Sequence, residues 1–263
     1  MQFTPQMLAG ISQAIQGQAE EMVVNRQRIA ALEARQQLSD EGRKQRMKIE
    51  FRSQFGEDLW IWDVLGWQTE GFFIEVGAFD GYHYSVTHAL EAMGWNGLLI
   101  EALPGPYEKC RERRTHSRVV NAALGRRGAS GTVNFVSVQD QYGGMLSYAE
   151  AKSDHAKSVE GKFKMSTIEA KLTSMDELLK DHNGPIDVAV IDVEGAEVDV
   201  LDGFNLEKYR PRLLVIEDNT GGKNPALGNY MGTKPYVFAG WLAVNRLYIR
   251  ADEEKMMERL KRY

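Results

Sequence analysis

The sequence predicts an α/β protein, with an open, mostly parallel sheet after residue 50 and a helical segment before it. From residue 72 onward, short apolar runs alternate with segments of helical character, a pattern typical of strand–helix units joined by right-handed crossovers. The runs 186–191 and 212–217 are bounded by charged residues, as strands buried on both faces of a sheet usually are. Residues 1–50 hold only one of the 25 aromatic residues, Phe3, so this segment cannot build a core of its own.

Composition and charge limit the classes of function. The chain has 263 residues, 43% of them hydrophobic and 26% charged, which is typical of one or two globular domains. Its net charge of −5 disfavours nucleic-acid binding by bulk electrostatics. The single cysteine, Cys110, excludes a disulfide framework and a cysteine zinc site. No apolar run approaches the roughly 20 residues of a membrane-spanning helix, and no secretory leader is recognisable at the start. We therefore expect a cytoplasmic protein without a membrane span.

Residues 1–48 are expected to be an N-terminal helix, separate from a domain at 49–263. Apolar residues recur every seven positions, with two more at the complementary positions, whereas Gln18 and Asn25 interrupt the same seam. Self-association of this helix into a homo-oligomer is the favoured interpretation, and a single helix lying on its own domain is the alternative. The number of subunits stays open. The seam residues are Leu8, Ile15, Met22 and Ile29, with Ile11 and Leu32.

The elements after residue 50 follow from apolar runs and from the residues that break them. Gly94 is expected to end the first helix, and Pro104 to start the second. Residues 236–250 contain two β-rich pieces, which indicate a closing hairpin. The expected strands are 72–76, 97–101, 117–122, 131–138, 186–191 and 212–217, and the expected helices are 82–94, 104–114, 174–182 and 195–203.

The first predicted strand is followed by a glycine-bearing turn, Glu75-Val-Gly-Ala-Phe-Asp-Gly81. Glycines at this point let the backbone turn tightly and approach a ligand. The dinucleotide pattern G-x-G-x-x-G is absent, which disfavours a pyrophosphate site. Glu101 ends the second strand, where a carboxylate accepts hydrogen bonds from ribose hydroxyls. The two signals together favour a ligand that contains adenosine.

Several motifs resemble the FkbM-type methyltransferases. They are Glu75–Gly81, Gly94-Trp-Asn-Gly-Leu-Leu-Ile-Glu101, Ile191-Asp-Val-Glu-Gly-Ala-Glu197, Ser53-Gln-Phe-Gly-Glu-Asp58 and Thr173-Ser-Met-Asp-Glu-Leu178 with Leu179, in the family's order over about residues 51–250. The resemblance implies a Rossmann-like sheet of seven strands and O-methyl transfer from S-adenosyl-L-methionine. The implied acceptor is a sugar hydroxyl of a glycan or glycoconjugate.

The resemblance also implies a set of cofactor-binding residues. Glu101 would hold the ribose hydroxyls, and Phe79 departs from the glycine that many class I methyltransferases have at this turn. Asp192 would lie where the methyl group meets the acceptor. The residues around the cofactor's amino acid and ribose would be Glu75, Gly77, Ala78, Asp80 and Gly81, and those beside its adenine Asn121 and Ala122.

The acceptor needs a base or a metal, because an aliphatic hydroxyl is a weak acid. Carboxylates and an amide follow two neighbouring strands, and such oxygen ligands suit Mg²⁺ or Mn²⁺. The layout is similar to catechol O-methyltransferase, and Asp192 is the expected catalytic residue. Glu197 has an alternative role at a helix N-terminus. The candidate metal ligands are Asp192, Glu217, Asp218 and Asn219, with Glu194 further into the turn.

Other side chains offer alternatives on the acceptor side. His83 is a candidate general base if no metal is bound. Tyr142 and Tyr230 lie in long loops and could stack on a sugar, whereas Trp95 and Trp241 are expected to pack in the core.

Two other functions compete with methyl transfer. An NAD(P)-dependent oxidoreductase could use the same sheet, but the missing G-x-G-x-x-G argues against it. A non-catalytic coiled-coil assembly protein could keep a methyltransferase-like fold. The intact Glu75, Gly77, Gly81, Glu101 and Asp192 argue against that interpretation.

Overall fold

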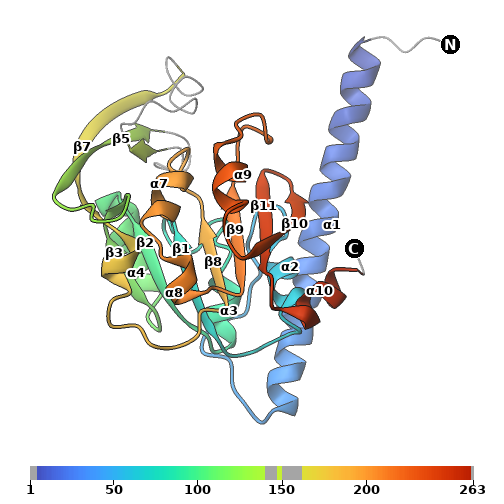
Figure 1. Ribbon diagram of the computed structural model, residues 1–263. Coiled ribbons are helices and arrows are strands. Elements are labelled where there is room, and N and C mark those ends of the chain that lie inside the picture. The colour runs from blue at the N-terminus through green and yellow to red at the C-terminus, as the bar shows by residue number, and fades with distance from the viewer. Residues whose placement is uncertain (1–4, 140–146, 150–161, 262–263) are drawn as a thin grey trace.

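A seven-stranded sheet organises the computed structural model, which describes residues 5–139, 147–149 and 162–261 (Figure 1). Its strands are β1 (Phe72–Val76), β2 (Asn96–Glu101), β3 (Arg118–Asn121), β8 (Val188–Ile191), β9 (Leu213–Glu217), β10 (Tyr236–Leu242) and β11 (Asn245–Arg250). They lie in the order β10-β11-β9-β8-β1-β2-β3. The strands from β9 to β3 are parallel, whereas β11 is antiparallel to both β9 and β10. The predicted Rossmann-like sheet and closing hairpin are confirmed.

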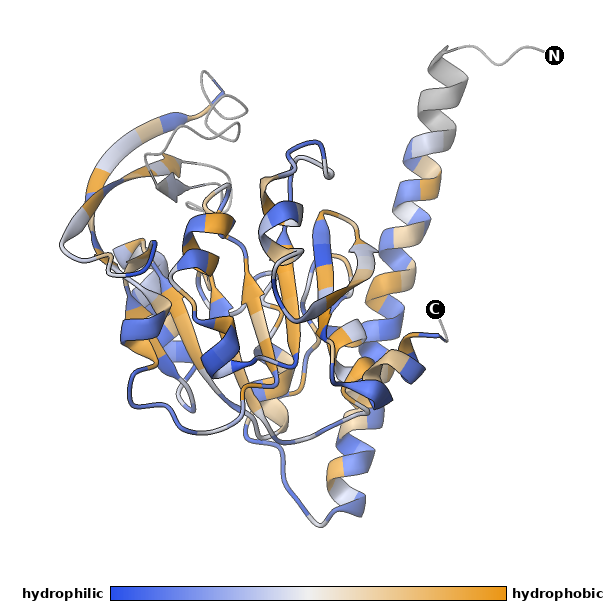
Figure 2. Cartoon of the chain, viewed as in Figure 1, coloured by the Kyte–Doolittle hydropathy of each residue, from blue (hydrophilic) through white to orange (hydrophobic). Residues whose placement is uncertain are grey.

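Helices cover both faces of this sheet. Alternate strand residues point to opposite faces, so Phe73 and Ile74 belong to two separate hydrophobic cores. One core includes residues of α1, α2, α3, α4 and α10, and the other residues of α6, α7, α8 and α9. Figure 2 shows apolar strands inside and hydrophilic stretches on the helices outside. The helices are α1 (Pro5–Asp40), α2 (Glu57–Val64), α3 (His88–Met93), α4 (Pro104–Arg113), α6 (Met175–Leu178), α7 (Glu197–Asp202), α8 (Leu206–Tyr209), α9 (Ala226–Met231) and α10 (Glu254–Leu260).

A second sheet lies beside the first and was only partly predicted. It consists of β4 (Ala123–Leu124), β5 (Thr132–Gln139), β6 (Tyr148–Ala149) and β7 (Lys164–Thr173), in the order β4-β7-β5-β6. The run 131–138 was expected as an added strand, and it pairs with β7 rather than with the main sheet. β7 was not predicted because most of its side chains are exposed and polar, so its sequence lacks the alternation of apolar and polar residues that indicates a strand.

The predicted helix 82–94 is shorter than expected. Only α3 is helical, and residues 82–87 form an irregular loop that Glu75 holds through Ser85, Val86 and Thr87. Buried polar side chains that bond to a neighbouring strand compete with helix formation there. The expected helices 174–182 and 195–203 are likewise shorter, because α6 has four residues and α7 has six.

Helix α1 lies on the domain that follows it. Ala30, Ala31, Ala34 and Leu38 are buried in the same core as α2, α3 and α10. The heptad residues with described side chains are instead exposed. The helix therefore contacts its own domain, through a face other than the predicted seam. No helix of the described chain is both long and apolar enough to cross a membrane.

Candidate active site

A cleft opens at the carboxyl ends of the parallel strands, where ligands of open α/β sheets bind. Its walls come from the ends of β1, β2 and β8 and, in the second sheet, from β4, β5 and the residues just before β4 and β6. Of the predicted cofactor residues, Gly77, Glu101, Ala122 and Asp192 line it. The other lining residues are Val76, Phe79, Ile100, Ala102, Ala123, Leu124, Phe135, Ser147, Val193, Glu194 and Ala196.

The glycine turn brings β1 against the end of β8. Gly77 has a φ of 79°, and a Cβ there would overlap the carbonyl oxygen of Asp192. The backbone N–H groups of Gly77 and Ala78 both donate to the carbonyl of Ile100, each at 3.0 Å. Only glycine allows this approach, so the turn joins three strand ends at the floor of the cleft.

Glu101 is a buried carboxylate held by backbone groups. One of its oxygens accepts from the N–H of Phe79 and the other from the N–H of Leu103, each at 2.8 Å. Burial raises the pKa of Glu101 to about 7, although these backbone hydrogen bonds oppose that shift. A carboxylate has about four acceptor positions, so capacity remains for ligand hydroxyls on the cleft side.

Phe79 takes a backbone conformation that glycine usually supplies. Its φ is 47°, in the left-handed region that glycine normally occupies. The hydrogen bond from its N–H to Glu101 holds it there, and its side chain lines the cleft. The departure from the family pattern thus adds an aromatic wall.

The remaining predicted cofactor residues support the turn from outside the cleft. Glu75 accepts hydrogen bonds from Ser85, Val86 and Thr87 and does not line the described cleft. Ala78 is buried, and Gly81 lies against Arg114 and Cys110. These three residues are absent from the cleft lining because their positions face the helices rather than the strand ends.

Asp80 and Asn121 are also positioning residues. Burial opposes ionisation of Asp80, but hydrogen bonds from His83 and Arg113 prevail and lower its pKa. Asn121 donates to the backbone carbonyls of Glu101 and Ala102, at 2.8 and 3.0 Å. Its amide nitrogen therefore secures the end of β2, and its place beside an adenine stays a prediction.

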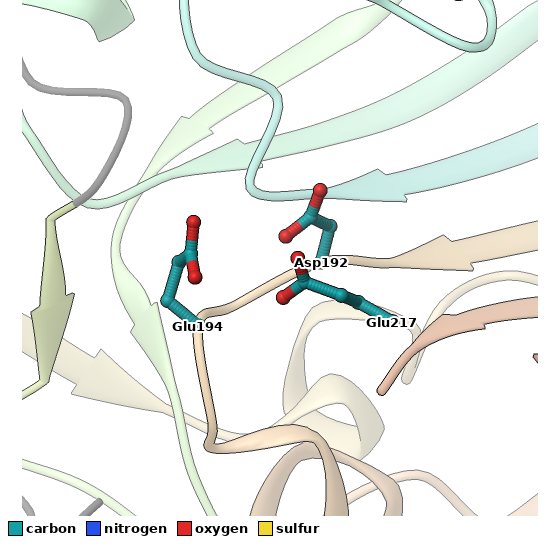
Figure 3. Close-up of side chains that lie close together, drawn as sticks. All are labelled: Asp192, Glu194 and Glu217. Atoms are coloured by element: carbon teal, nitrogen blue, oxygen red, sulfur yellow. The ribbon is translucent and has the colours of Figure 1, made fainter. Parts of the chain in front are cut away.

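Three carboxylates meet at the ends of β8 and β9. Asp192, Glu194 and Glu217 each place an oxygen within 4.8 Å of the other two, and Figure 3 shows them gathered at the turn after β8. Glu194 reaches this position with a φ of 55°. Asp192 is exposed on the side that faces the cleft, whereas protein atoms close to its carboxylate shield it from water on the other sides. Glu217 is buried, and its Oε2 has no hydrogen-bond partner among the described residues.

The electrostatics of this cluster favour a proton or a cation. Burial and the charge of Glu194 raise the pKa of Asp192, while burial and the charge of Asp192 raise the pKa of Glu217. A hydrogen bond between Asp192 and Glu217 favours the charged form of Asp192 and the protonated form of Glu217. Two like charges this close do not both ionise readily, so the charge of each carboxylate favours the protonated form of the other.

A further carboxylate, Glu57, was not singled out from the sequence. It is buried, accepts a hydrogen bond from the Asn245 side chain at 2.8 Å, and adds to the negative field at Asp192. Burial raises its own pKa. Asn245 pairs with Glu217 across β11 and β9, which explains how a residue of α2 comes so near the cluster. In the sequence, the only indication of a role for Glu57 was its position within the motif Ser53–Asp58.

Asp218 does not belong to the cluster, which corrects its predicted role as a metal ligand. One of its oxygens accepts from Arg246 at 2.7 Å, and the other from the N–H of Thr220 at 3.0 Å. Asn219 donates to Glu194 at 3.2 Å and so touches the cluster only through that residue. Glu197 accepts from the N–H of Gly195, which fits its alternative role at the start of α7.

The histidine and aromatic candidates lie elsewhere. His83 is 52% exposed, bonds to Asp80 through Nδ1 at 2.7 Å and is not part of the cleft lining, so its role as the base is not supported. Tyr230 donates to the carbonyl of Leu201, packs on the core and does not line the described cleft. Tyr142 lies outside the described residues. Trp95 is buried as expected, whereas Trp241 is exposed beside Arg246.

Phe135 and Ser147 line the cleft from the second sheet. Their contribution was missed because it depends on how β5 and the chain before β6 fold back over the main sheet. The alternating pattern of 131–138 indicated a strand but carried no information on its partner.

Comparisons with known proteins give one family match and several distant structural neighbours. The Methyltransferase FkbM domain matches residues 75–231. The METTL16 methyltransferase domain superposes with a TM-score of 0.43 and 13% identity, over 78% of this chain and 69% of that one. A TehB-like SAM-dependent methyltransferase from Corynebacterium glutamicum gives 0.41 and 11%, over 82% and 93%. Precorrin-6y C5,15-methyltransferase from Geobacter metallireducens gives 0.39 and 11%, over 74% and 86%.

No curated protein matches the chain in sequence. The family match covers the glycine turn, Glu101, the acidic cluster and the sheet that carries them. This chain therefore belongs to the FkbM methyltransferase family.

Proposed function

We propose that the protein is an S-adenosyl-L-methionine-dependent O-methyltransferase. Its acceptor would be a sugar hydroxyl of a glycan or glycoconjugate, as the family resemblance implies. The observation that carries the proposal is the charge of the cleft. Among its described lining residues, the charged ones are all carboxylates: Glu101, Asp192 and Glu194.

This charge distribution discriminates between cofactors. A pyrophosphate would meet carboxylates and no basic lining residue in the described cleft, which disfavours NAD(P). A sulfonium and an α-ammonium group are cations, and a negative cleft attracts both. Glu101 has acceptor capacity for the ribose hydroxyls, and Ala122, Leu124 and Phe135 offer an apolar wall for a base. These contacts support S-adenosyl-L-methionine.

The acidic cluster supplies the acceptor chemistry. Asp192, ionised and hydrogen-bonded to Glu217, is placed to take the hydroxyl proton as the oxygen–methyl bond forms and the carbon–sulfur bond breaks. A base whose pKa is raised by burial is well matched to work near neutral pH. The cleft floor fixes Asp192 through Gly77, so acceptor and methyl group would be aligned by the same rigid turn.

The cluster also fits a divalent cation. Asp192, Glu194 and Glu217 would hold Mg²⁺ or Mn²⁺, and the unpartnered Oε2 of Glu217 is a free oxygen ligand of the kind these ions bind. Such an ion supplies Lewis-acid chemistry, lowering the pKa of a bound hydroxyl.

Binding measurements test the proposal directly. Calorimetry with S-adenosylhomocysteine, with NAD and with MnCl₂ should give binding of the first and not of the second. Manganese binding that disappears in Glu217→Gln identifies the cation site, whereas its absence in wild type leaves Asp192 as a metal-free base. Binding of NAD in place of S-adenosylhomocysteine overturns the proposed function.

A further inference from the structure

Helix α1 carries an exposed apolar stripe that its own domain does not cover. The described side chains of the stripe are Ile15, Met22, Ile29 and Leu32, which are 62%, 73%, 51% and 62% exposed. Leu8 and Ile11 continue the same spacing in the sequence. Large aliphatic residues exposed in one row mark an interaction surface.

The stripe lies opposite the face that contacts the domain. The docked face contains Gln27, Ala30, Ala34 and Leu38, all buried. At about 100° per residue, Met22 and Ile29 point roughly 180° away from that face. The domain therefore leaves Ile15, Met22 and Ile29 accessible, whereas Leu32 borders a hollow that Gly66 and Trp67 also line. Figure 1 shows the first half of α1 extending beyond the sheet.

The charges that flank the stripe are complementary to those of a second copy. Glu21, Arg28 and Arg35 precede successive seam positions on one side, and Arg26, Glu33 and Asp40 follow them on the other. In a parallel, in-register coiled coil, a residue on the first flank faces the partner residue about five positions further along. The pairs are Glu21 with the partner's Arg26, Arg28 with the partner's Glu33 and Arg35 with the partner's Asp40, all of opposite sign.

We propose that α1 forms a parallel, in-register, two-stranded coiled coil with a second copy of this chain. β-Branched Ile15 and Ile29 at one seam position with Leu32 at the other favour two strands. Gln18 and Asn25 specify the register at some cost in stability. Because the domains dock on the outer faces of the pair, each active-site cleft stays open, and the assembly is independent of the proposed reaction.

Existing contacts of the flanking residues do not oppose this arrangement. Arg26 pairs with Glu33 of its own helix at 2.7 Å, and both side chains are about two-fifths exposed. Arg35 donates to the carbonyl of Ile49 at 3.3 Å. Exposed ion pairs contribute about 0–1 kcal/mol, so exchanging an internal pair for one between subunits costs little.

The subunit number and the effect of the stripe test the proposal. Light scattering of the full chain should give twice the 29.7 kDa of one copy. Met22→Glu with Ile29→Glu should give monomers, whereas Val24→Glu, an exposed apolar position off the stripe, should leave the dimer unchanged. Circular dichroism verifies that each variant is folded. Monomeric wild type, a trimer or tetramer, or a dimer that survives the double variant overturns the proposal.

Strand direction requires a second experiment. In a parallel, in-register pair, residue 18 lies beside its counterpart, so Gln18→Cys should cross-link into a covalent dimer under mild oxidation. Gln16→Cys, two residues away on the opposite side of the helix, should not. The sole native thiol, Cys110, is buried and does not interfere. A dimer that fails to cross-link through residue 18 contradicts the parallel register.

Discussion

The two ends of the cleft use the same side-chain type in opposite ways. At the β2 end, each oxygen of Glu101 accepts a backbone N–H, so the carboxylate is fixed before any ligand arrives. At the β8 and β9 ends, carboxylates face one another, and one oxygen of Glu217 has no hydrogen-bond partner in the part of the chain that the structure describes. The difference indicates that the first end is built to hold a ligand and the second to handle a proton or a cation.

The largest effect should come from the proton-handling end. Asp192→Asn removes the proposed base and should lower turnover by roughly 10²–10⁴-fold. Affinity for S-adenosylhomocysteine should change little, because Glu101 and the glycine turn are untouched. Steady-state methyl transfer and calorimetry measure the two quantities. Equal losses of turnover and of affinity would show that Asp192 also binds the cofactor, so that the two ends of the cleft do not have separate roles.

Glu101→Ala should affect the ligand-holding end. Hydrogen bonds to a charged group contribute about 1.5–3 kcal/mol, so affinity for S-adenosylhomocysteine should fall roughly 10- to 150-fold. Calorimetry on protein that keeps its circular dichroism spectrum checks this value. Unchanged affinity would remove Glu101 from the cofactor site.

Removal of the carboxylate of Glu217 should weaken cation binding at little cost in stability. Glu217→Gln should lose affinity for Mn²⁺ by roughly tenfold or more, because an anionic oxygen ligand becomes an amide, and it should keep its stability near neutral pH, because the amide can donate to Asp192 as the protonated carboxyl does. Asp218→Asn is the matched control: it should keep the cation and become less stable, because Arg246 loses its buried partner. Manganese titration and thermal unfolding separate the two variants. The reverse ranking for the cation would restore Asp218 as the ligand.

The pH dependence of stability should run opposite to that of activity. The folded state binds protons more tightly than the unfolded chain at Glu101, whose pKa is about 7 instead of 4.5, and at the Asp192–Glu217 pair. Between about pH 4.5 and 7, the free energy of unfolding therefore rises as the pH falls. Turnover should fall over the same range as the base is protonated. Glu217→Gln should flatten the stability profile; an unchanged slope would show that the pair does not titrate there.

The smallest effect should come from His83. His83→Ala should leave turnover within about twofold, because the side chain bonds to Asp80 outside the cleft. Methyl-transfer rates measured beside Asp192→Asn test the contrast between the two candidate bases. A loss of about 10²-fold in His83→Ala would move the proton-accepting role to this residue.

The sheet was predictable because its strands are apolar runs with charged ends, as in 186–191 and 212–217. Positions at strand ends were predictable for the same reason, and Glu101 and Asp192 lie where expected. Side-chain direction was not. Glu75 precedes the turn by two residues, yet its carboxylate serves the loop 82–87. Asp218 follows Glu217 directly, yet Arg246, from another strand, holds its side chain.

The remaining site residues depend on long-range placement. Glu194 joins the cluster because its backbone takes a positive φ, which no local propensity of glutamate indicates. Glu57 and Phe135 arrive from α2 and from the second sheet. On α1, the seven-residue spacing was recognisable, but the alanines that dock on the domain resemble ordinary helix formers.

The contact of Gly77 with the carbonyl of Asp192 has a consequence for how this enzyme could change its acceptor. With no room for even one methyl group between the two strand ends, neither can shift without carrying the other. Variation at the floor would therefore disturb cofactor and acceptor together. New acceptor preferences would have to arise away from this floor, in surface loops, which in proteins generally tolerate substitutions and insertions.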